Sequence, residues 1–543
     1  MNIRHWIETN LMSLAREFRL TYLPPLMVYV AAGIQGLTAI VGTFFIKDYL
    51  GLSAEFLAAL GFWAGLPWAL KMPLGHLVDL MWRFKSLLVY LGASLIAISI
   101  LIMIGLLADP EAMRAWASLE HWFVLSALLA PIGYVTQDVV ADALTVEAVP
   151  LVDAQGQPVP EEARKSMHTT MQTLGRVAII GGSLIVGLVN VFVLRGVHQA
   201  PEAERLAAYV LIYTLALIIP VVSVAGVILA GHLARRRRRQ LISEGFTAAQ
   251  ARAMTDVQGE STHVNWWILG GGLFFTAASL SIGLSDAPFL RQWGQEIIFT
   301  VSMAVILFLM MRLVRELTPG ARSTLIGTAI VIFVFRALPG PGAGSTWWQI
   351  DVLGFDQEFL SVLSLIASAL TLAGLFIFRR FMAERSIYEI VAVLTIAGFF
   401  LSLPILGMFY GLHEWTASLT GGIVDARFIA LVDTALESPL GQIAMVPMLA
   451  WIANSAPSNL KATFFAVMAS FTNLALSASQ LGTKYLNQVF VITREVRDPK
   501  TQAITVPADY SELGTLLILV SVLALIVPFV AILIARSARM RSG

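Results

Sequence analysis

Cysteine is absent from the 543-residue chain, which excludes disulfide bonds, thiolate metal sites and thiol catalysis. Charged residues are also scarce: they make up 13% of the chain, against about 25% in a typical soluble domain. The net charge of +1 gives no global field that would attract nucleic acid. No glycine-rich loop ending in lysine is present to cradle phosphates, so no ATP-driven step is indicated.

Long apolar runs dominate the chain instead. Hydrophobic residues make up 57% of it and the mean hydropathy is +0.77, as expected for a protein that lies in lipid. A membrane-spanning helix needs about 20 mostly apolar residues, and about fourteen runs approach that length. The sequence therefore predicts an all-α polytopic membrane protein.

An internal repeat divides the chain into two halves. Asp48–Leu60 and Asp351–Leu363 share seven of thirteen residues, and each copy joins the first and second spans of a six-span set. Repeated halves with a binding site at their interface are a common transporter plan. The predicted domains are an amphipathic cytoplasmic segment at 1–23, a six-helix half at 24–233, a basic cytoplasmic linker at 234–263, an inserted helix pair at 264–313, a second six-helix half at 314–536 and a cytoplasmic tail at 537–543.

Basic residues orient the predicted spans. The run Arg235–Arg239 and most other basic residues of the connections fall on one side, which the positive-inside rule makes the cytoplasm. Both termini are then cytoplasmic, and the first twenty residues lack the short apolar core of a signal peptide. We expect a multi-pass protein of a bacterial inner membrane.

The segment Gln137–Glu147, QDVVADALTVE, places carboxylates inside a predicted span. A charge at the bilayer centre costs about 2.5–3.5 kcal/mol on insertion scales, so such residues usually face the bundle interior. Asp138 and Asp142 are four residues apart and share one helical face, which makes them the candidates for proton carriage. The alternative is a fixed ion pair that only locks helices together. Because both acids share one helix, an intramembrane aspartyl protease is not expected, nor any other enzyme. Gln137 is a candidate substrate-binding residue.

Two cations lie at the same predicted depth as Asp138. Lys71 in the second span and Arg176 in the fifth each lie about ten residues, or roughly 15 Å, from the cytoplasmic end of their helices. Arg176 suits an anionic substrate group because guanidinium binds a carboxylate in a fork, and Gln172 lies one turn away. Lys71 is a further substrate-binding candidate. The alternative for both cations is that they only balance the aspartates.

The second half offers uncharged polar residues. Gln442 and Asn473 are candidates for binding a ring that presents hydrogen-bond donors and acceptors. The competing interpretation is a hydrogen bond between two helices, which is the commoner use of such residues in membranes. No grouping of residues predicts a metal site or a cofactor, so we expect neither.

Five segments occur in the order in which one known family has them. They are FFIKDYLGLS at Phe44–Ser53, PWALKMPLGHLVD at Pro67–Asp79, QDVVADALTVE at Gln137–Glu147, VLGFDQEFL at Val352–Leu360 and PLGQIAMVPMLA at Pro439–Ala450. The chain thereby resembles the folate-biopterin transporters, a branch of the major facilitator superfamily. The resemblance implies the major facilitator fold and uptake of a folate- or pteridine-like solute with protons. The inserted pair at 264–313 is a departure, since the family has about twelve spans.

The loop between the second and third spans resembles the superfamily's gate loop in shortened form. Asp79 is followed by Arg83 and Lys85, and the resemblance implies that a carboxylate and basic residues here latch the cytoplasmic side. Glu147, at the cytoplasmic end of the fourth span, is a further gate candidate.

Together these observations predict a proton-coupled secondary transporter that moves a folate- or pteridine-like solute, or another organic anion, by alternating access. Two alternatives stay open. One is a non-transporting helper in membrane assembly or pigment handling on the same fold, with a partner protein bound through the inserted helices. The other is a carrier of cell-wall fragments. We expect a monomer whose partners are a small-molecule substrate, protons and membrane lipid, without nucleic acid.

Overall fold

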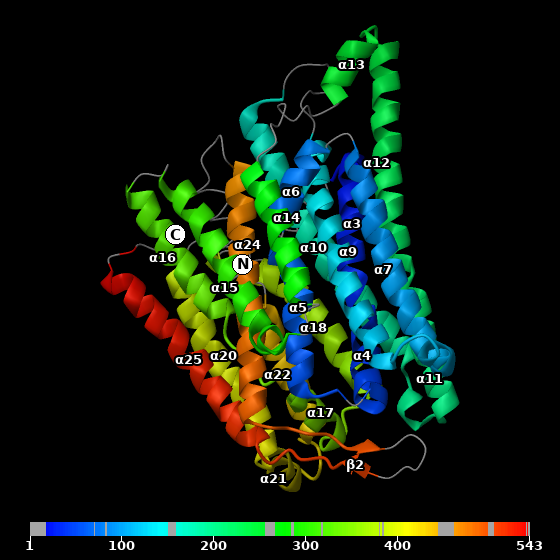
Figure 1. The fold of residues 1–543 in the computed structure, drawn as a ribbon, viewed down its shortest axis with the longest axis vertical. Helices are drawn as coiled ribbons and strands as arrows, with labels where there is room; N and C mark the ends of the chain where they lie inside the picture. The colour runs from blue at the N-terminus through cyan, green and yellow to red at the C-terminus, as the bar shows by residue number, and fades with distance from the viewer. Residues whose placement is uncertain are drawn as a thin grey trace. The chain divides into compact units, whose positions relative to one another are not determined.

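The computed structural model describes most of the chain. The described residues are 18–50, 52–69, 71–81, 84–149, 159–255, 266–283, 287–315, 319–378, 381–382, 385–441, 443, 461–497, 504–538 and 540. Within these ranges the chain is almost entirely helical, and one small sheet pairs β1 (Val496–Arg497) with β2 (Ile504–Val506) antiparallel (Figure 1). A helix satisfies its backbone polar groups within one segment, which is what a lipid environment requires.

The first half of the sequence forms helices close to the expected spans. In chain order they are η2 (Leu20–Tyr22), α3 (Leu23–Ile34), η3 (Gln35–Thr38), α4 (Ala39–Phe45), η4 (Ile46–Leu50), α5 (Ala54–Ala69), α6 (Lys71–Leu80), α7 (Lys85–Ala108), α8 (Pro110–Arg114), α9 (Leu119–Ala148), α10 (Glu161–Val193), η6 (Val197–Gln199), α11 (Glu202–Ala216) and α12 (Ile218–Ser243). Of the amphipathic segment predicted at 1–23, residues 1–17 lie outside the described residues.

The linker, the insertion and the second half are helical as well. Their elements are α13 (Ala248–Thr255), α14 (Trp266–Gly283), α15 (Pro288–Arg315), α16 (Pro319–Arg336), α17 (Ala343–Asp351), α18 (Gln357–Ile377), α20 (Ile387–Phe409), α21 (Leu412–Leu419), α22 (Ala426–Glu437), η7 (Ser438–Leu440), α24 (Lys461–Val489) and α25 (Leu513–Ser537).

Eight helical segments among the described residues are long and apolar enough to cross a membrane. The polytopic all-α class is therefore confirmed, whereas the number of about fourteen spans stays a prediction. Several expected spans are built from shorter pieces. The second, for example, is divided between α5 and α6, and α5 alone has 16 residues.

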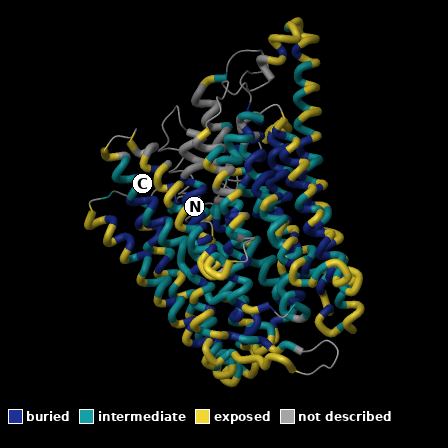
Figure 2. Tube along the Cα trace, in the orientation of Figure 1, coloured by how far each residue is buried: buried dark blue, intermediate teal, exposed yellow. Residues whose placement is uncertain are grey.

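The basic linker is partly helical. Helix α12 continues through the run Arg235–Arg239 and ends at Ser243, because arginine is a good helix former. Helix α13 then folds back on it, burying Leu241 and Ala251. Figure 2 shows exposed positions along this part of α12 and buried ones again at the tip, where α13 contacts it.

The chain divides into two compact units. Unit 1 comprises Met1–Thr38, Pro73–Asn190 and Leu206–Leu269, and unit 2 comprises Ala39–Met72, Val191–Arg205 and Gly270–Gly543. Unit 2 thus includes α4 and α5, which belong to the first half of the sequence. The division into halves predicted from the repeat stays a prediction.

Glycine allows a close contact between α7 and α9 in unit 1. A Cβ atom on Gly92 of α7 would lie 2.6 Å from the carbonyl oxygen of Gly133 of α9, and the reverse distance is also 2.6 Å. No larger residue fits at either position without moving the backbones apart. The acid-bearing helix α9 is therefore held directly against α7.

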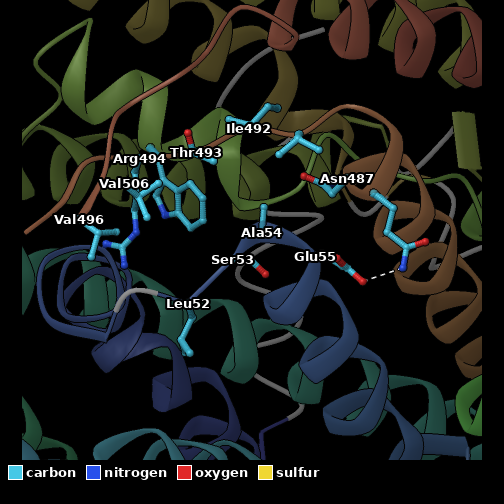
Figure 3. A pocket seen from close by; sticks show the side chains of 13 residues that line it. Leu52, Ser53, Ala54, Glu55, Asn487, Ile492, Thr493, Arg494, Val496 and Val506 are labelled. Carbon is cyan, nitrogen blue, oxygen red and sulfur yellow. Dashed lines mark hydrogen bonds between the residues drawn. The ribbon is translucent and has the colours of Figure 1, made fainter. Parts of the chain in front are cut away.

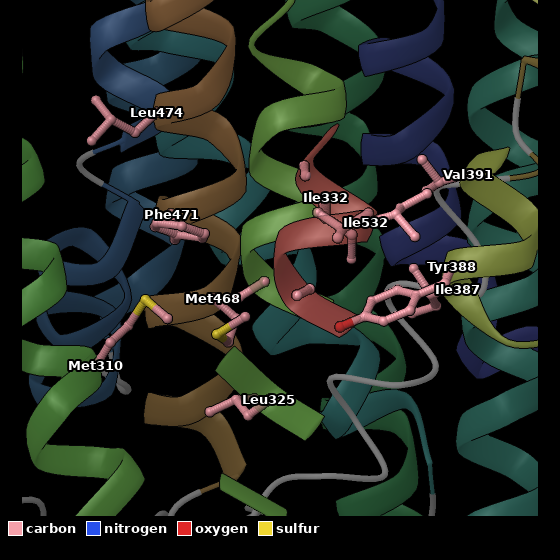
Figure 4. Packing of buried hydrophobic residues seen from close by; sticks show 14 of the residues in the cluster. Met310, Leu325, Ile332, Ile387, Tyr388, Val391, Met468, Phe471, Leu474 and Ile532 are labelled. Atoms are coloured by element: carbon pink, nitrogen blue, oxygen red, sulfur yellow. The ribbon is translucent and has the colours of Figure 1, made fainter. Parts of the chain in front are cut away.

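Unit 2 is held together by apolar packing around α24. One cluster joins α16, α20, α24 and α25 through residues that include Leu325, Tyr388, Phe471 and Ile532 (Figure 4). A second cluster packs Phe62 of α5 against Leu481 of α24 and Ile298 of α15. Helix α24 thus contacts one helix from the first half of the sequence and one from the insertion.

Candidate functional site

The acid pair predicted on the fourth span lies on α9, in unit 1. The Tyr29 hydroxyl of α3 donates a hydrogen bond of 2.8 Å to Oδ1 of Asp142. Asp138 lies one turn earlier on the same face of α9. The Tyr29 side chain is buried, so this carboxylate and phenol meet inside the helix bundle.

Tyr29 also connects α9 to α10. A Cβ atom on Gly175 would lie 2.8 Å from Cε2 of Tyr29, so the tyrosine ring rests directly on the α10 backbone. The next residue is Arg176, and the Tyr29 hydroxyl lies within electrostatic range of Asp138, Asp142 and Arg176. The structure therefore brings two acids, a phenol and a guanidinium together from α3, α9 and α10.

Tyr29 is the member of this cluster that sequence reasoning missed. Its only signal was a single phenol within the apolar run of the first span, and its partner Asp142 lies 113 residues further along the chain. A tyrosine in such a run is usually a packing residue, because its ring carries most of its buried surface.

Gln137 faces away from this cluster, into the packing of α9 against two other helices. Its side chain is 3% exposed, and Nε2 donates to the Val89 carbonyl oxygen at 3.2 Å and to Oγ of Ser223 at 2.9 Å. These bonds tie α9 to α7 and α12. The geometry supports the helix-packing interpretation of Gln137 rather than substrate binding.

Asn473 has a similar place in unit 2. Its Nδ2 donates to the Trp68 carbonyl oxygen of α5 at 3.3 Å, so the side chain connects α24 to α5. Lys71 begins α6 and also falls in unit 2, so its predicted pairing with the aspartates of unit 1 stays a prediction.

The other predicted residues lie on α6, α7, α9 and α10 or outside the described residues. Lys85 is buried at the start of α7. The helical backbone is described at Asp79, Glu147 and Gln172, but their side chains lie outside the description. Arg83 and Gln442 lie outside the described residues altogether. The predicted cytoplasmic gate therefore stays a prediction.

An ion pair that the sequence did not reveal joins the ends of two corresponding spans in unit 2. Nζ of Lys47, in η4, lies 2.6 Å from Oδ1 of Asp351 at the end of α17. The Tyr510 hydroxyl donates to the other oxygen of Asp351 at 2.5 Å. Burial raises the pKa of Tyr510, and the bond to Asp351 raises it further, so this phenol stays a donor at neutral pH.

A second unforeseen polar cluster fixes the inserted helix α15. Oε1 of Glu296 accepts hydrogen bonds from Nζ of Lys484 at 3.1 Å and from the Tyr485 hydroxyl at 2.5 Å, both on α24. The preceding residue, Gln295, donates to the Ala59 carbonyl oxygen of α5 at 3.2 Å. The insertion therefore contacts α5 and α24 together.

Solved membrane transporters share this fold. A POT family transporter in complex with 5-aminolevulinic acid matches with a TM-score of 0.59 and 12% identity, over 95% of this chain and 96% of that one. A nucleoside transporter, NupG, matches with a TM-score of 0.53 and 9% identity, over 95% and 99% of the two chains. The chain thus shares the overall fold of these solved proteins.

The sequence narrows the class to one family. A sequence model of the BT1 family matches residues 32–542, so the chain belongs to the BT1 family, a branch of the major facilitator superfamily. The chain is also 21% identical over 454 residues to the folate-biopterin transporter of Synechocystis sp. (strain ATCC 27184 / PCC 6803 / Kazusa), covering 83% of this chain and 71% of that protein. The predicted family, fold class and assignment as a transport protein rather than an enzyme are confirmed.

Proposed function

We propose that the chain is a proton-coupled secondary transporter that moves a folate- or pteridine-like solute, or a related organic anion, by alternating access. The observation that carries this proposal is the cluster of Asp138, Asp142 and Arg176 around the buried Tyr29 on α3, α9 and α10. The similarity to a folate-biopterin transporter supports the choice of solute.

Each member of the cluster has a chemical role in this proposal. Asp138 and Asp142 exchange a proton with the aqueous side that is open, and Tyr29 orients the Asp142 carboxylate through its hydrogen bond. Arg176 binds the anionic group of the solute, since guanidinium matches a carboxylate in a bidentate fork. A protonated aspartate competes less for Arg176, so proton and anion binding support each other.

Alternating access requires contacts that form on one side of the membrane and break as the other side closes. In our proposal the Lys47–Asp351 pair is such a contact at the outer ends of the first spans of the two sequence halves. Asp79, Arg83, Lys85 and Glu147 would form its cytoplasmic counterpart. Gln172, Lys71 and Gln442 remain proposed contributors to the solute site.

The remaining features complete the proposal. The protein is a monomer of a bacterial inner membrane with both termini in the cytoplasm. The six-helix halves cover 24–233 and 314–536, and the arginines of α12 contact anionic lipid headgroups on the cytoplasmic side.

Uptake by purified protein in liposomes tests the proposal. We expect radiolabelled folate or biopterin to accumulate when the outside is acidic, and the initial rate to fall as the outside pH rises. In Asp138→Asn the pH gradient should drive at least tenfold less accumulation, because the proton site is lost. The matched control Asp509→Asn changes an exposed loop carboxylate and should accumulate solute like the unchanged protein.

Two results would contradict the proposal. Full gradient-driven accumulation by Asp138→Asn would remove this residue from the coupling. Failure to move any folate or pteridine, together with stoichiometric co-purification of a partner protein, would favour the helper function instead.

A further inference from the structure

A pocket of ≈ 340 Å³ lies in unit 2, apart from the acid cluster of unit 1. Its wall is formed by the start of α5, the end of α24, Trp347 of α17 and the segment that leads into β1 (Figure 3). The residues at the start of α5 lie within the first copy of the internal repeat, Asp48–Leu60. The volume lies at the lower end of the range of about 300–1,000 Å³ seen for small-molecule sites.

Arg494 supplies a cation to this pocket. Its side chain is 3% exposed, and its guanidinium carbon lies 5.3 Å from the centroid of the Trp347 ring. Trp347 is itself buried, so the guanidinium is held against a rigid aromatic surface. A guanidinium fixed in this way loses little conformational freedom when it binds a carboxylate.

Glu55 supplies an anion at the other side of the pocket. Its Oε1 accepts a hydrogen bond of 2.6 Å from Nε2 of Gln488, which orients the carboxylate. In Figure 3 the Arg494 and Glu55 side chains lie at opposite sides of the view, with Ser53 and Ala54 between them. The lining of the pocket also includes apolar side chains such as those of Leu52 and Val491.

Two opposite charges across an apolar wall select a particular chemistry. Guanidinium binds a carboxylate, and a carboxylate binds adjacent N–H donors such as those on the edge of an aminated nitrogen heterocycle. The apolar wall suits the faces of a flat ring. The volume suits a single ring system rather than a long conjugate.

We propose that this pocket is a docking site for a planar, amine-bearing nitrogen heterocycle that carries a carboxylate. The carboxylate contacts Arg494, and the amine-bearing edge contacts Glu55. This docking site rests on the proposed function, in which such solutes are the cargo. It assigns them a first binding position in unit 2, in addition to the cluster at Arg176.

The same pocket is connected to the Lys47–Asp351 pair. Arg494 lies within electrostatic range of Tyr510, whose hydroxyl donates to Asp351. A carboxylate bound at Arg494 therefore adds negative charge in the surroundings of Tyr510, the donor to Asp351.

Binding of pterin-6-carboxylate to the purified full-length protein tests the proposal. The measurement uses calorimetry in detergent on the Arg176→Ala variant, so that the unit 1 cluster does not contribute. We expect binding to persist in Arg176→Ala and to weaken at least tenfold when Arg494→Gln is added. The matched control Arg427→Gln removes a different arginine of unit 2, one paired with Asp356, and should leave the affinity unchanged.

A second variant guards against misfolding of Arg494→Gln. Val491 lines the pocket and is 56% exposed, so Val491→Trp fills the pocket from its rim without disturbing buried packing. This variant should also weaken binding at least tenfold. Unchanged binding in both Val491→Trp and Arg494→Gln, or no binding in Arg176→Ala, would overturn the proposal.

A comparison of the affinities of pterin-6-carboxylate and of pterin, which lacks the carboxylate, tests whether the carboxylate contacts Arg494. Pterin-6-carboxylate should bind at least tenfold more tightly than pterin when Arg494 is present, and the two should bind equally in Arg494→Gln. A preference for the carboxylate that survives in Arg494→Gln would overturn the assignment. Failure of folate uptake with Arg494-dependent binding intact would instead reject the proposed transport function and leave the docking site standing.

Discussion

Two partly buried carboxylates, Asp142 and Glu296, each accept a hydrogen bond from a tyrosine, and their surroundings differ. Asp142 of α9 meets Tyr29 in a cluster that is spread over three helices and includes a second acid and Arg176. Glu296 of α15 meets Lys484 and Tyr485, which are consecutive residues of one helix. The first cluster combines two acids, a phenol and a guanidinium from three helices, whereas the second joins two helices through a compact ion pair.

This difference shows that burial of a carboxylate does not by itself indicate function. Lys484 lies 3.1 Å from Glu296, so the pair neutralises itself and fixes the inserted helix on α24. The Asp142 site has its phenol and its guanidinium on two different helices, so a shift of either helix changes its electrostatics. We therefore expect α15 to depend on Glu296 for stability, and transport to depend on Asp142 for coupling.

The largest loss of stability should follow from Glu296→Leu. This change leaves Lys484 in a partly buried site without its carboxylate. Breaking a fully buried pair costs about 3–5 kcal/mol, so this partly exposed pair should cost less than that but more than the ~1 kcal/mol of a surface pair. Denaturant unfolding in detergent measures the free energy of unfolding. The double variant Glu296→Leu/Lys484→Met should recover most of the loss, and a double variant as unstable as the single one would show that the ion pair is not the cause.

Gly175→Ala should have the next largest effect, through the Tyr29 ring. The new Cβ atom would lie 2.8 Å from Cε2 of Tyr29, and overpacking of this kind costs about 1–3 kcal/mol. We expect lower stability together with weaker pH-driven uptake. Gly181→Ala on the same helix is the matched control, because its Cβ meets no described atom within 4 Å. Equal effects of the two changes would mean that helix propensity, not contact with Tyr29, is responsible.

Removing each tyrosine hydroxyl compares the two clusters directly. Tyr29→Phe keeps the ring on Gly175 but removes the donor to Asp142, a loss of about 1 kcal/mol that should alter the pH dependence of uptake several-fold. Tyr485→Phe leaves Glu296 with Lys484 and should leave the pH profile unchanged. The initial rate of uptake across a pH series gives the answer. Identical profiles for both variants would remove Tyr29 from the coupling.

The smallest loss of stability is expected at Asp351. Like Glu296, it has a lysine and a tyrosine as partners, but its side chain is more exposed than that of Glu296. Pairs that water can reach contribute about 1 kcal/mol or less. A double-mutant cycle with Lys47→Gln and Asp351→Asn should give a coupling free energy in that range. The Arg427–Asp356 pair, whose arginine is more exposed, should give a smaller value. If the coupling free energy of Lys47 with Asp351 were as large as that of Glu296 with Lys484, solvent access would not explain the difference in strength that we expect between the two pairs.

Much of the fold could be predicted from local sequence, and the site only in part. The segment Gln137–Glu147 identified α9 and its acid pair, because residues four apart share a helical face whatever surrounds them. The same segment suggested that Gln137 binds substrate, but the Gln137 amide instead connects α9 to α7 and α12. No sequence pattern singled out Arg494, which the fold places against Trp347 from a distant part of the sequence.

The sequence by itself determined that this protein is a multi-pass helical transporter. It could do so because each membrane helix must satisfy its own backbone hydrogen bonds, which leaves a readable apolar run for each span. Only the tertiary structure decided which polar side chains meet. Tyr29 and Asp142 are 113 residues apart, and Glu296 and Lys484 are 188 apart. Their pairing depends on which helices pack against each other, and no local sequence pattern predicts that packing.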